Sequence, residues 1–418
     1  MPKFRISEQY YGNGINVAVG TGCASMTIPL YSGMVWIFPP IGGKKTMARQ
    51  CLNHCVCERV RSTRALYKQP PGLKATNQDA GRPELSENYD TAKIKLEGPD
   101  GYRALRQYQR PSVWKASWQL ANTLVPYLLL CVLMVFALKA GVSYGFILGL
   151  AVVAAALLVR IFIFFHDCAH NCFLGSRKAN AVLGYVCGIL TFAPYEEWRK
   201  IHGIHHNTYG DLDRRGEGDV WTLTTAEYQA ASKLKRFLYR FCRNPFILLG
   251  VGPLYLFLVS YRYPRKGARR RQIYSVIVTN AAILAIIVTA GLTIGFKTYV
   301  LIQFPVIFMA GVTGVWLFYI QHQFEGAYWA RHDQWDWITA SLQGSSYYKL
   351  PKVLQWITGN IGLHHIHHLR PRIPNYNLQR CYDETPSLAA VKPLTLFKSF
   401  QCLHLKLWDE KKQKLVSF

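Results

Sequence analysis

Four long apolar segments alternate with polar and basic stretches along the chain, at residues 120–138, 144–165, 273–292 and 299–320. Each approaches the roughly 20 predominantly apolar residues that a helix needs to cross a bilayer. Very short loops join the first segment to the second and the third to the fourth. The pattern therefore predicts four transmembrane helices in two hairpins. The one charge inside them, Arg160, lies near the end of its segment, where its side chain can reach the interface or support a site.

Two further apolar stretches are less regular. The stretch 179–194 is too short to span comfortably, and 245–261 is interrupted by glycine and proline. We predict that both dip into the interface without crossing.

Basic residues gather in three regions: the approach to the first segment, the stretch 233–243 and the stretch 262–272. The two hairpin loops carry one lysine each, Lys139 and Lys297. Loops rich in Lys and Arg stay on the cytoplasmic side of a membrane. If only the four long segments cross, all three basic regions share that side. The N-terminus, the loop 166–272 and the C-terminus are then predicted to be cytoplasmic.

Histidines concentrate in three clusters, at 166–170, 202–206 and 364–368, which hold nine of the 13 in the chain. Within each cluster, histidines three or four residues apart share one face of a helix. His322 directly follows the fourth apolar segment and emerges at the same predicted membrane face. We therefore expect one shared metal site, built from segments far apart in sequence.

The candidate ligands are His166, His170, His202, His205, His206, His322, His364, His367 and His368. Neutral imidazole is the commonest nitrogen ligand for metals. A catalytic zinc takes about three protein ligands, so nine histidines suit two metal ions with some positions left open. Imidazole accepts iron, zinc, copper or nickel, so ligand type alone does not select the metal.

Other polar residues near the clusters are candidates for orienting the imidazole N–H groups. His365 falls on another helical face and is interpreted as a supporting or structural residue. The remaining candidates are Asp167, Glu196, Glu197, Asp211, Asp219, Glu325, Asp333, Asp336 and Asn360. For each of them the alternative reading is a solvated loop charge or amide.

Composition agrees with a membrane protein, because only 17% of the 418 residues are charged and half are hydrophobic. The net charge of +26 does not indicate a nucleic-acid binder, since the basic residues flank apolar runs. The group Cys51, His54, Cys55 and Cys57 lacks a partner pair at zinc-finger distance and is read as accidental spacing. Residues 1–96 are predicted to be a largely disordered tail, 97–400 the membrane domain and 401–418 a C-terminal tail.

The three clusters resemble the histidine boxes of the integral-membrane fatty acid desaturases. The boxes read His166-Asp-Cys-Ala-His170, His202-Gly-Ile-His-His206 and His364-His-Ile-His-His368. Their flanking residues match too, in Gly218-Asp-Val-Trp-Thr222 and Gln321-His-Gln-Phe-Glu325. The combination is most similar to the acyl-lipid desaturases of the Δ12 (omega-6) and related bacterial type. The resemblance covers about residues 100–400.

The resemblance implies an all-α membrane fold with a cytoplasmic helical cap, in a bacterial inner membrane. It implies that the nine candidate histidines hold two non-haem iron ions, which use O₂ to remove two hydrogens from an alkyl chain. The two electrons would come from a separate ferredoxin or cytochrome b5, because the chain has no His-Pro-Gly-Gly element of a fused cytochrome b5 domain. The implied substrate is a membrane lipid or another acyl compound, and no nucleic acid takes part.

Two other functions fit parts of the sequence. A related di-iron fatty acyl hydroxylase, acetylenase or carotenoid oxygenase would use the same boxes. A histidine-rich metal transporter would instead place ionisable residues along its spans, whereas these histidines lie at the ends of the spans. An acyl substrate requires an apolar tunnel. The candidate lining aromatics are Phe192, Trp198, Trp316, Phe318 and Tyr319, each of which could equally serve ordinary packing.

Overall fold

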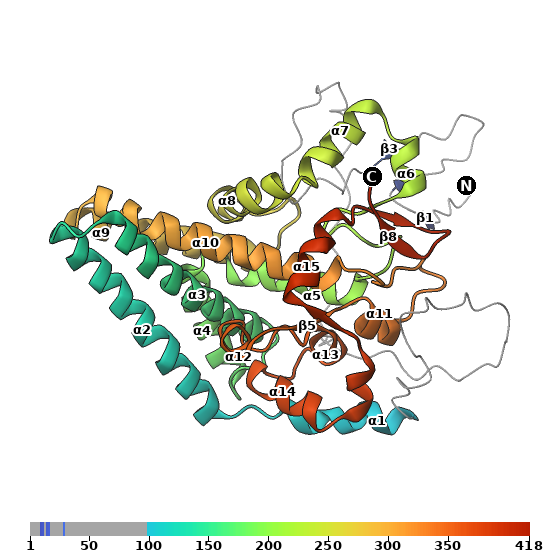
Figure 1. The fold of residues 1–418 in the computed structure, drawn as a ribbon, viewed down its shortest axis with the longest axis horizontal. Helices are drawn as coiled ribbons and strands as arrows, with labels where there is room; N and C mark the ends of the chain where they lie inside the picture. Colours follow the sequence, from blue (N-terminus) through green and yellow to red (C-terminus); the bar gives the residue numbers. More distant parts are fainter. Residues whose placement is uncertain (1–8, 12–13, 17–27, 30–97) are drawn as a thin grey trace, which may run out of the picture. The chain divides into compact units, whose positions relative to one another are not determined.

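The computed structural model describes residues 9–11, 14–16, 28–29 and 98–418. Within these residues, four helices are long and apolar enough to cross a membrane (Figure 1): α2 (Val113–Lys139), α3 (Tyr144–Ala169), α9 (Arg270–Thr293) and α10 (Phe296–His322). Each contains one of the four predicted segments, which confirms that prediction.

Short turns join these helices in pairs. Ser112 begins α2, where its Oγ accepts the backbone N–H of Lys115 at 3.4 Å. Gly141, at φ +72°, lies in the turn between α2 and α3, and Gly295, at φ +92°, lies between α9 and α10. Glycine adopts these left-handed conformations without the steric cost that a Cβ would add. The members of each pair pack on one another, as two hairpins require.

α3 is the central helix, packed against α2, α10 and α4 (Arg177–Leu190). Its packing face carries small residues, including Ala151, Ala154 and Ala155, which are buried. Small side chains let neighbouring helices approach closely in a membrane, where dispersion contacts replace the hydrophobic effect as the driving force.

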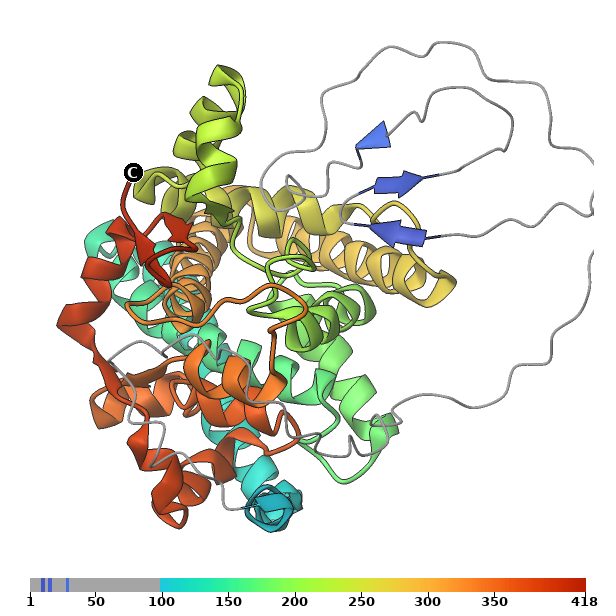
Figure 2. The same ribbon diagram turned by 90° about the vertical axis from the view of Figure 1, so that its right-hand side faces the viewer.

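Shorter helices gather around the ends of α3 and α10 that carry histidines (Figures 1 and 2). They are α5 (Tyr195–Thr208), α11 (Trp337–Gln343), α12 (Lys352–Ile357), α13 (His364–Leu369), α14 (Asn375–Asp383) and α15 (Leu396–Gln401). α6 (Thr225–Ala230) and α7 (Lys233–Cys242) lie further out, at the top of Figure 1, and α1 (Gly98–Ala104) precedes α2. The fold class is therefore helical, with four candidate spans and a helical cap.

The strands in the described residues are short, with two or three residues each. β4 (Leu223–Thr224) pairs in parallel with β7 (Leu407–Asp409), which pairs antiparallel with β8 (Lys414–Val416). β5 (Tyr347–Lys349) pairs in parallel with β6 (Pro393–Thr395). Before the membrane domain, β1 (Gln9–Tyr11), β2 (Gly14–Asn16) and β3 (Ile28–Pro29) form an antiparallel sheet of their own.

The structure describes one of the two segments that the sequence predicts to be tails, and only small parts of the other. The segment 401–418 contains β7 and β8, and the Trp408 side chain is only 1% exposed, so this segment packs as part of the cap instead of forming a tail. Apart from the strands β1 to β3, the expected tail 1–96 lies outside the described residues. The cysteine group at 51–57 lies there as well.

The two irregular apolar stretches form helices that differ from the four long ones. α4 has 14 residues, or about 21 Å, too short for a hydrocarbon core of about 30 Å. The helical segment 247–262, which includes α8 (Gly252–Leu254), is bent by 63° relative to α7. It contains Gly250, Gly252 and Pro253, and much of it has π-helical hydrogen bonding.

Candidate metal centre

The nine candidate histidines converge into two groups. The five-histidine group contains His166, His170, His202, His206 and His367, and the four-histidine group contains His205, His322, His364 and His368. Within each group, one nitrogen from every imidazole lies within 4.8 Å of the others. The structure thus brings together all the candidate ligands that the spacing indicated.

Four helices supply these side chains. α3 carries His166 in its last turn and ends just before His170, and α10 ends at His322. α5 supplies one member of the four-histidine group and two of the other, and α13 supplies His367 to the five-histidine group and two members to the four-histidine group. Because α5 and α13 each contribute to both groups, the two candidate metal positions are neighbours.

The ring nitrogens face one another at nearly constant separation. In the five-histidine group, the Nε2 atoms of His202 and His170 are 2.9 Å apart, and His206 Nε2 lies 3.0 Å from those of His202 and His367. In the four-histidine group, the Nε2 atoms of His205 and His364 each lie 3.0 Å from His322 Nε2.

These separations have a simple geometric reading. Two imidazole nitrogens bound at about 2.1 Å to one metal ion lie about 3.0 Å apart at a right angle, and about 3.4 Å apart at the tetrahedral angle. The observed values of 2.9–3.0 Å are short enough for both nitrogens of a pair to bind one ion, and all the ligand atoms of each group lie within 4.8 Å of one another. Each group of imidazole donors therefore fits a bound metal ion.

Three of the histidines have acceptors at Nδ1, which leaves Nε2 free to act as the ligand atom. His205 Nδ1 lies 2.7 Å from Asp219 Oδ1, and His166 Nδ1 lies 3.1 Å from Asp167 Oδ1. His322 Nδ1 lies 3.3 Å from the Gly344 carbonyl oxygen. These contacts hold each ring with its Nε2 directed toward the neighbouring rings.

Further residues support these acceptors. Asn375 donates its backbone N–H at 2.7 Å and its side-chain N–H at 2.9 Å to Asp167 Oδ2. Gly218, at φ +81°, lies so close to His205 that a Cβ would stand 2.8 Å from the Cβ of that histidine. Neither residue was a candidate in the sequence, because both act through contacts distant along the chain.

The other polar candidates lie away from the two groups. Asp211 accepts from Arg214 and His332, Glu196 pairs with Arg199, and Glu197 pairs with Arg265 and Gln272. Asp336 caps α11, and the Asn360 side chain donates to the Asn375 carbonyl oxygen. Glu325 and Asp333 are exposed. Of the nine polar candidates, only Asp167 and Asp219 contact a grouped histidine.

Burial keeps most of these imidazoles neutral. Desolvation, reinforced by neighbouring histidines, lowers the pKa well below the usual range for His170, His202, His206, His364, His367 and His368. Neutral imidazole is the form that binds a metal. His365 lies outside both groups, between Tyr347 and Tyr382, and burial lowers its pKa to about 3.

An apolar cavity leads to the two groups. Four histidines line it, His166, His202, His205 and His364, together with apolar side chains of α3, α10 and the segment 247–262. Of the candidate aromatics, Trp198, Phe318 and Tyr319 line this cavity. Phe192 and Trp316 do not, and Trp316 instead stacks on Phe400. The cavity is lined mainly by apolar groups, so it fits a hydrocarbon chain.

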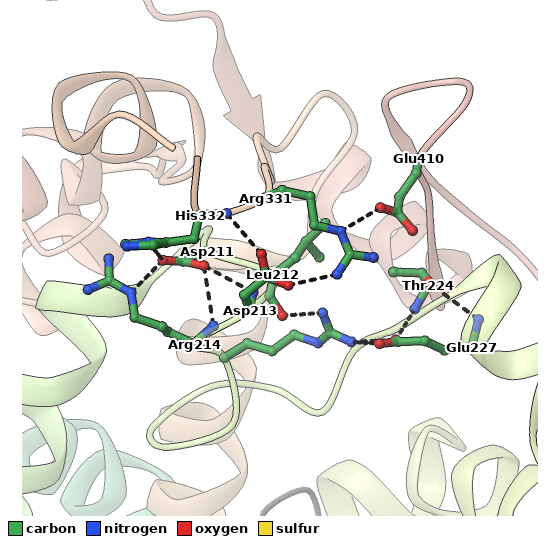
Figure 3. Close-up of polar contacts among 10 residues, drawn as sticks. Asp211, Leu212, Asp213, Arg214, Thr224, Glu227, Arg331, His332 and Glu410 are labelled. Atoms are coloured by element: carbon green, nitrogen blue, oxygen red, sulfur yellow. Dashed lines mark hydrogen bonds and ion pairs between the residues drawn. The ribbon is translucent and has the colours of Figure 1, made fainter. Parts of the chain in front are cut away.

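A polar network braces the chain just beyond α5 (Figure 3). Asp211 is fully buried and accepts from His332 Nδ1 at 2.8 Å, while Arg331 donates to Asp213 at 2.7 Å and to Glu410 at 2.8 Å. The network ties the loop after α5 to the loop before α11 and to the C-terminal hairpin β7–β8. This explains why the C-terminal segment belongs to the cap.

One fold thus combines four candidate spans, two histidine groups that could hold metal ions and an apolar cavity that reaches both groups. A family model described as fatty acid desaturase matches residues 144–398. The chain belongs to this family, and it is an enzyme of the oxidoreductase class.

Individual relatives agree with this assignment. A fatty acid desaturase of Bacillus subtilis (strain 168) is 44% identical over 311 residues, covering 74% of this chain and 88% of the relative. An sn-1 oleoyl-lipid 12-desaturase of Picosynechococcus sp. is 26% identical, covering 59% of this chain and 71% of the relative. An endoplasmic-reticulum omega-3 fatty acid desaturase of Vigna radiata is 27% identical, covering 52% and 59%.

Proposed function

We propose that this protein is an acyl-lipid desaturase that introduces a cis double bond at the Δ12 (omega-6) position through a di-iron centre. The observation that carries the proposal is the apolar cavity with histidines of both groups in its wall. The Δ12 position is supported by the relatives named as oleoyl-lipid 12-desaturases, at 26% and 27% identity.

The nine histidines of the two groups would hold the two iron ions. Imidazole is a ligand that iron accepts, and nine imidazole donors shared by two ions would leave positions available for O₂. When bound, the iron pair supplies the activation of O₂ that removes two hydrogens from adjacent methylenes. In the overall reaction, –CH₂–CH₂– and O₂, with two electrons and two protons, give –CH=CH– and two molecules of water.

The protein contributes position and environment. The carboxylates of Asp167 and Asp219 accept from His166 and His205, and so fix which ring nitrogen faces the metal. The side chains along α3 and α10 exclude water and hold one pair of methylenes near the histidines. Holding the reacting groups in place in this way supplies much of the catalysis of a difficult step.

The electrons would come from a separate ferredoxin or cytochrome b5. The basic loops would attract an acidic donor and also anionic lipid headgroups. We further propose that the protein lies in a bacterial inner membrane with the histidine groups on the cytoplasmic side. The positive-inside rule supports this orientation, since the stretches 233–243 and 262–272 are basic.

Expression in a host that lacks polyunsaturated lipids tests the proposal, with mass spectrometry of the fatty acids. The expected product is a diunsaturated acyl chain in membrane lipid, with its new double bond at Δ12. A hydroxylated or acetylenic product would assign the chain to a sister reaction. A new double bond at another position would contradict the proposed Δ12 position but would agree with the proposed desaturase activity.

A further inference from the structure

The lining of the cavity follows one face of α10. Lining residues recur every three or four positions, at Ile307, Ala310, Gly314, Phe318 and Gln321. From the first to the last of these, the helix rises about 21 Å at about 1.5 Å per residue. The cavity thus extends from the histidines toward the middle of the candidate span.

The histidine end of this face lies at Phe318. The Phe318 ring is 5.5 Å from the ring of His205 and 5.7 Å from the ring of His322, measured between centroids. Gly314 lies one turn further from the histidines. A substrate chain that reacts beside the histidines must therefore pass Gly314 to reach the deeper part of the cavity.

Two glycines on this face have different surroundings. A Cβ on Gly311 would stand 3.0 Å from the Pro253 Cβ and 3.4 Å from the Phe257 ring, so helix packing explains its small size. A Cβ on Gly314 would meet nothing within 4 Å. Glycine is an unfavourable residue in a helix interior, and at position 314 no neighbouring group is close enough to require a residue without a side chain. The space beside Gly314 belongs to the cavity.

We propose that Gly314 is a specificity-determining residue, which keeps the cavity open for the methyl end of the acyl chain. The inference rests on the proposed desaturase function. The methyl end is the apolar end of the substrate, so it enters the membrane-embedded part of the cavity, while the polar headgroup stays at the interface.

The distances show which substrates depend on this position. An extended methylene advances about 1.25 Å, from a carbon–carbon bond of about 1.52 Å and an angle of about 111°. The four residues from Phe318 to Gly314 rise about 6 Å along the helix, which corresponds to about five methylenes. Acyl chains with more carbons than this beyond the reacting pair must pass Gly314.

The test compares Gly314→Phe and the milder Gly314→Ala with Gly149→Phe and Gly149→Ala. Gly149 is a matched control, because it lies in the candidate span α3, a Cβ there also meets nothing within 4 Å, and it does not line the cavity. Each full-length protein is expressed in cells supplied with stearoyl, arachidoyl and behenoyl chains, which have about five, seven and nine carbons beyond a double bond at Δ12, so that only the two longer chains must pass Gly314. Products are measured by mass spectrometry for chain length and double-bond position.

For Gly314→Phe we expect the ratio of long-chain to short-chain products to fall by about 10-fold or more, or the double bond to move toward the methyl end. Gly314→Ala should cause a smaller change in the same direction, and the Gly149 variants should match the unaltered protein. Unchanged ratios and positions in both Gly314 variants would overturn the inference. So would loss of all products in Gly314→Ala at normal protein levels. A parent protein that makes no unsaturated product would contradict the desaturase function itself.

Discussion

The Nδ1 atom of His205 lies 2.7 Å from Asp219 Oδ1, and both side chains are buried. The carboxylate thereby sets the orientation of a ring whose Nε2 lies 3.0 Å from that of His322. Asp219 comes 14 residues after His205, in the segment that follows α5. Gly218 makes the close approach possible, because a Cβ there would stand 2.8 Å from the Cβ of His205.

Replacing Asp219 with Asn should weaken the metal site without preventing insertion. The amide can no longer act as a charged acceptor for the His205 ring, and removing such a partner typically reduces metal affinity or activity by about 10- to 100-fold. Iron content and turnover of the purified protein measure the effect. Asp333→Asn is the control, because Asp333 is exposed and contacts no grouped histidine. Equal iron content and activity in the two variants would contradict the role given to Asp219.

Replacing His205 or His367 with Ala should abolish turnover and lower the iron content below two ions per chain. Each substitution removes one nitrogen donor from a different group. Metal analysis of the purified protein and mass spectrometry of lipids give the two readouts. His404→Ala serves as the control, because His404 is exposed and lies outside both groups. Active unaltered protein that holds a single zinc ion would contradict the di-iron proposal.

Helical periodicity was sufficient to find eight of the nine grouped histidines, because residues three and four apart share a face. His322 was indicated instead by its position directly after the fourth apolar segment. Periodicity could not show that His205 joins a different group from His202 and His206. That division depends on His322 from α10 and on α13, both distant along the chain. The same limit applies to the Gly344 carbonyl oxygen and to Asn375, whose contacts with the site are entirely tertiary.

The four spans were equally clear from the sequence, because an apolar run of about 20 residues has few alternatives. By contrast, the sequence did not indicate that the C-terminal segment 401–418 forms strands. β7 and β8 are three residues each, and β7 pairs with a strand near residue 223. Short strands of this kind carry too little local pattern to distinguish them from a tail, and their burial follows from pairing that sequence periodicity does not report.

Trp408→Ala should therefore destabilise the cap. The Trp408 side chain is 1% exposed within β7, and truncating a buried tryptophan typically costs about 3–5 kcal/mol. We expect a lower melting temperature in detergent and reduced activity, measured by thermal unfolding and product analysis. Phe397→Ala is the control, since its side chain is 83% exposed. Full stability after deletion of residues 401–418 would show that this segment is a dispensable tail after all.

A chain that begins at Glu97 should still insert and turn over. The four candidate spans and all nine grouped histidines follow this position, and the family model matches residues 144–398. Membrane fractionation and lipid analysis of the shortened protein provide the test. Normal insertion combined with complete loss of activity would show that residues 1–96 take part in catalysis or in docking the electron donor.

The proposed topology requires the hairpin turns on one side of the membrane and the histidine groups on the other. In a cysteine-depleted background, Ser143→Cys and Lys297→Cys, which lie at the two turns, should react with an impermeant thiol reagent added outside the cell. Lys266→Cys and Arg380→Cys, both at exposed positions, should react only after the membrane is permeabilised. Permeabilised cells thus provide the positive control for the two protected positions. Labelling of Lys266→Cys from outside would mean that α7 and the segment 247–262, bent by 63°, form a fifth span, and the four-span topology would have to be abandoned.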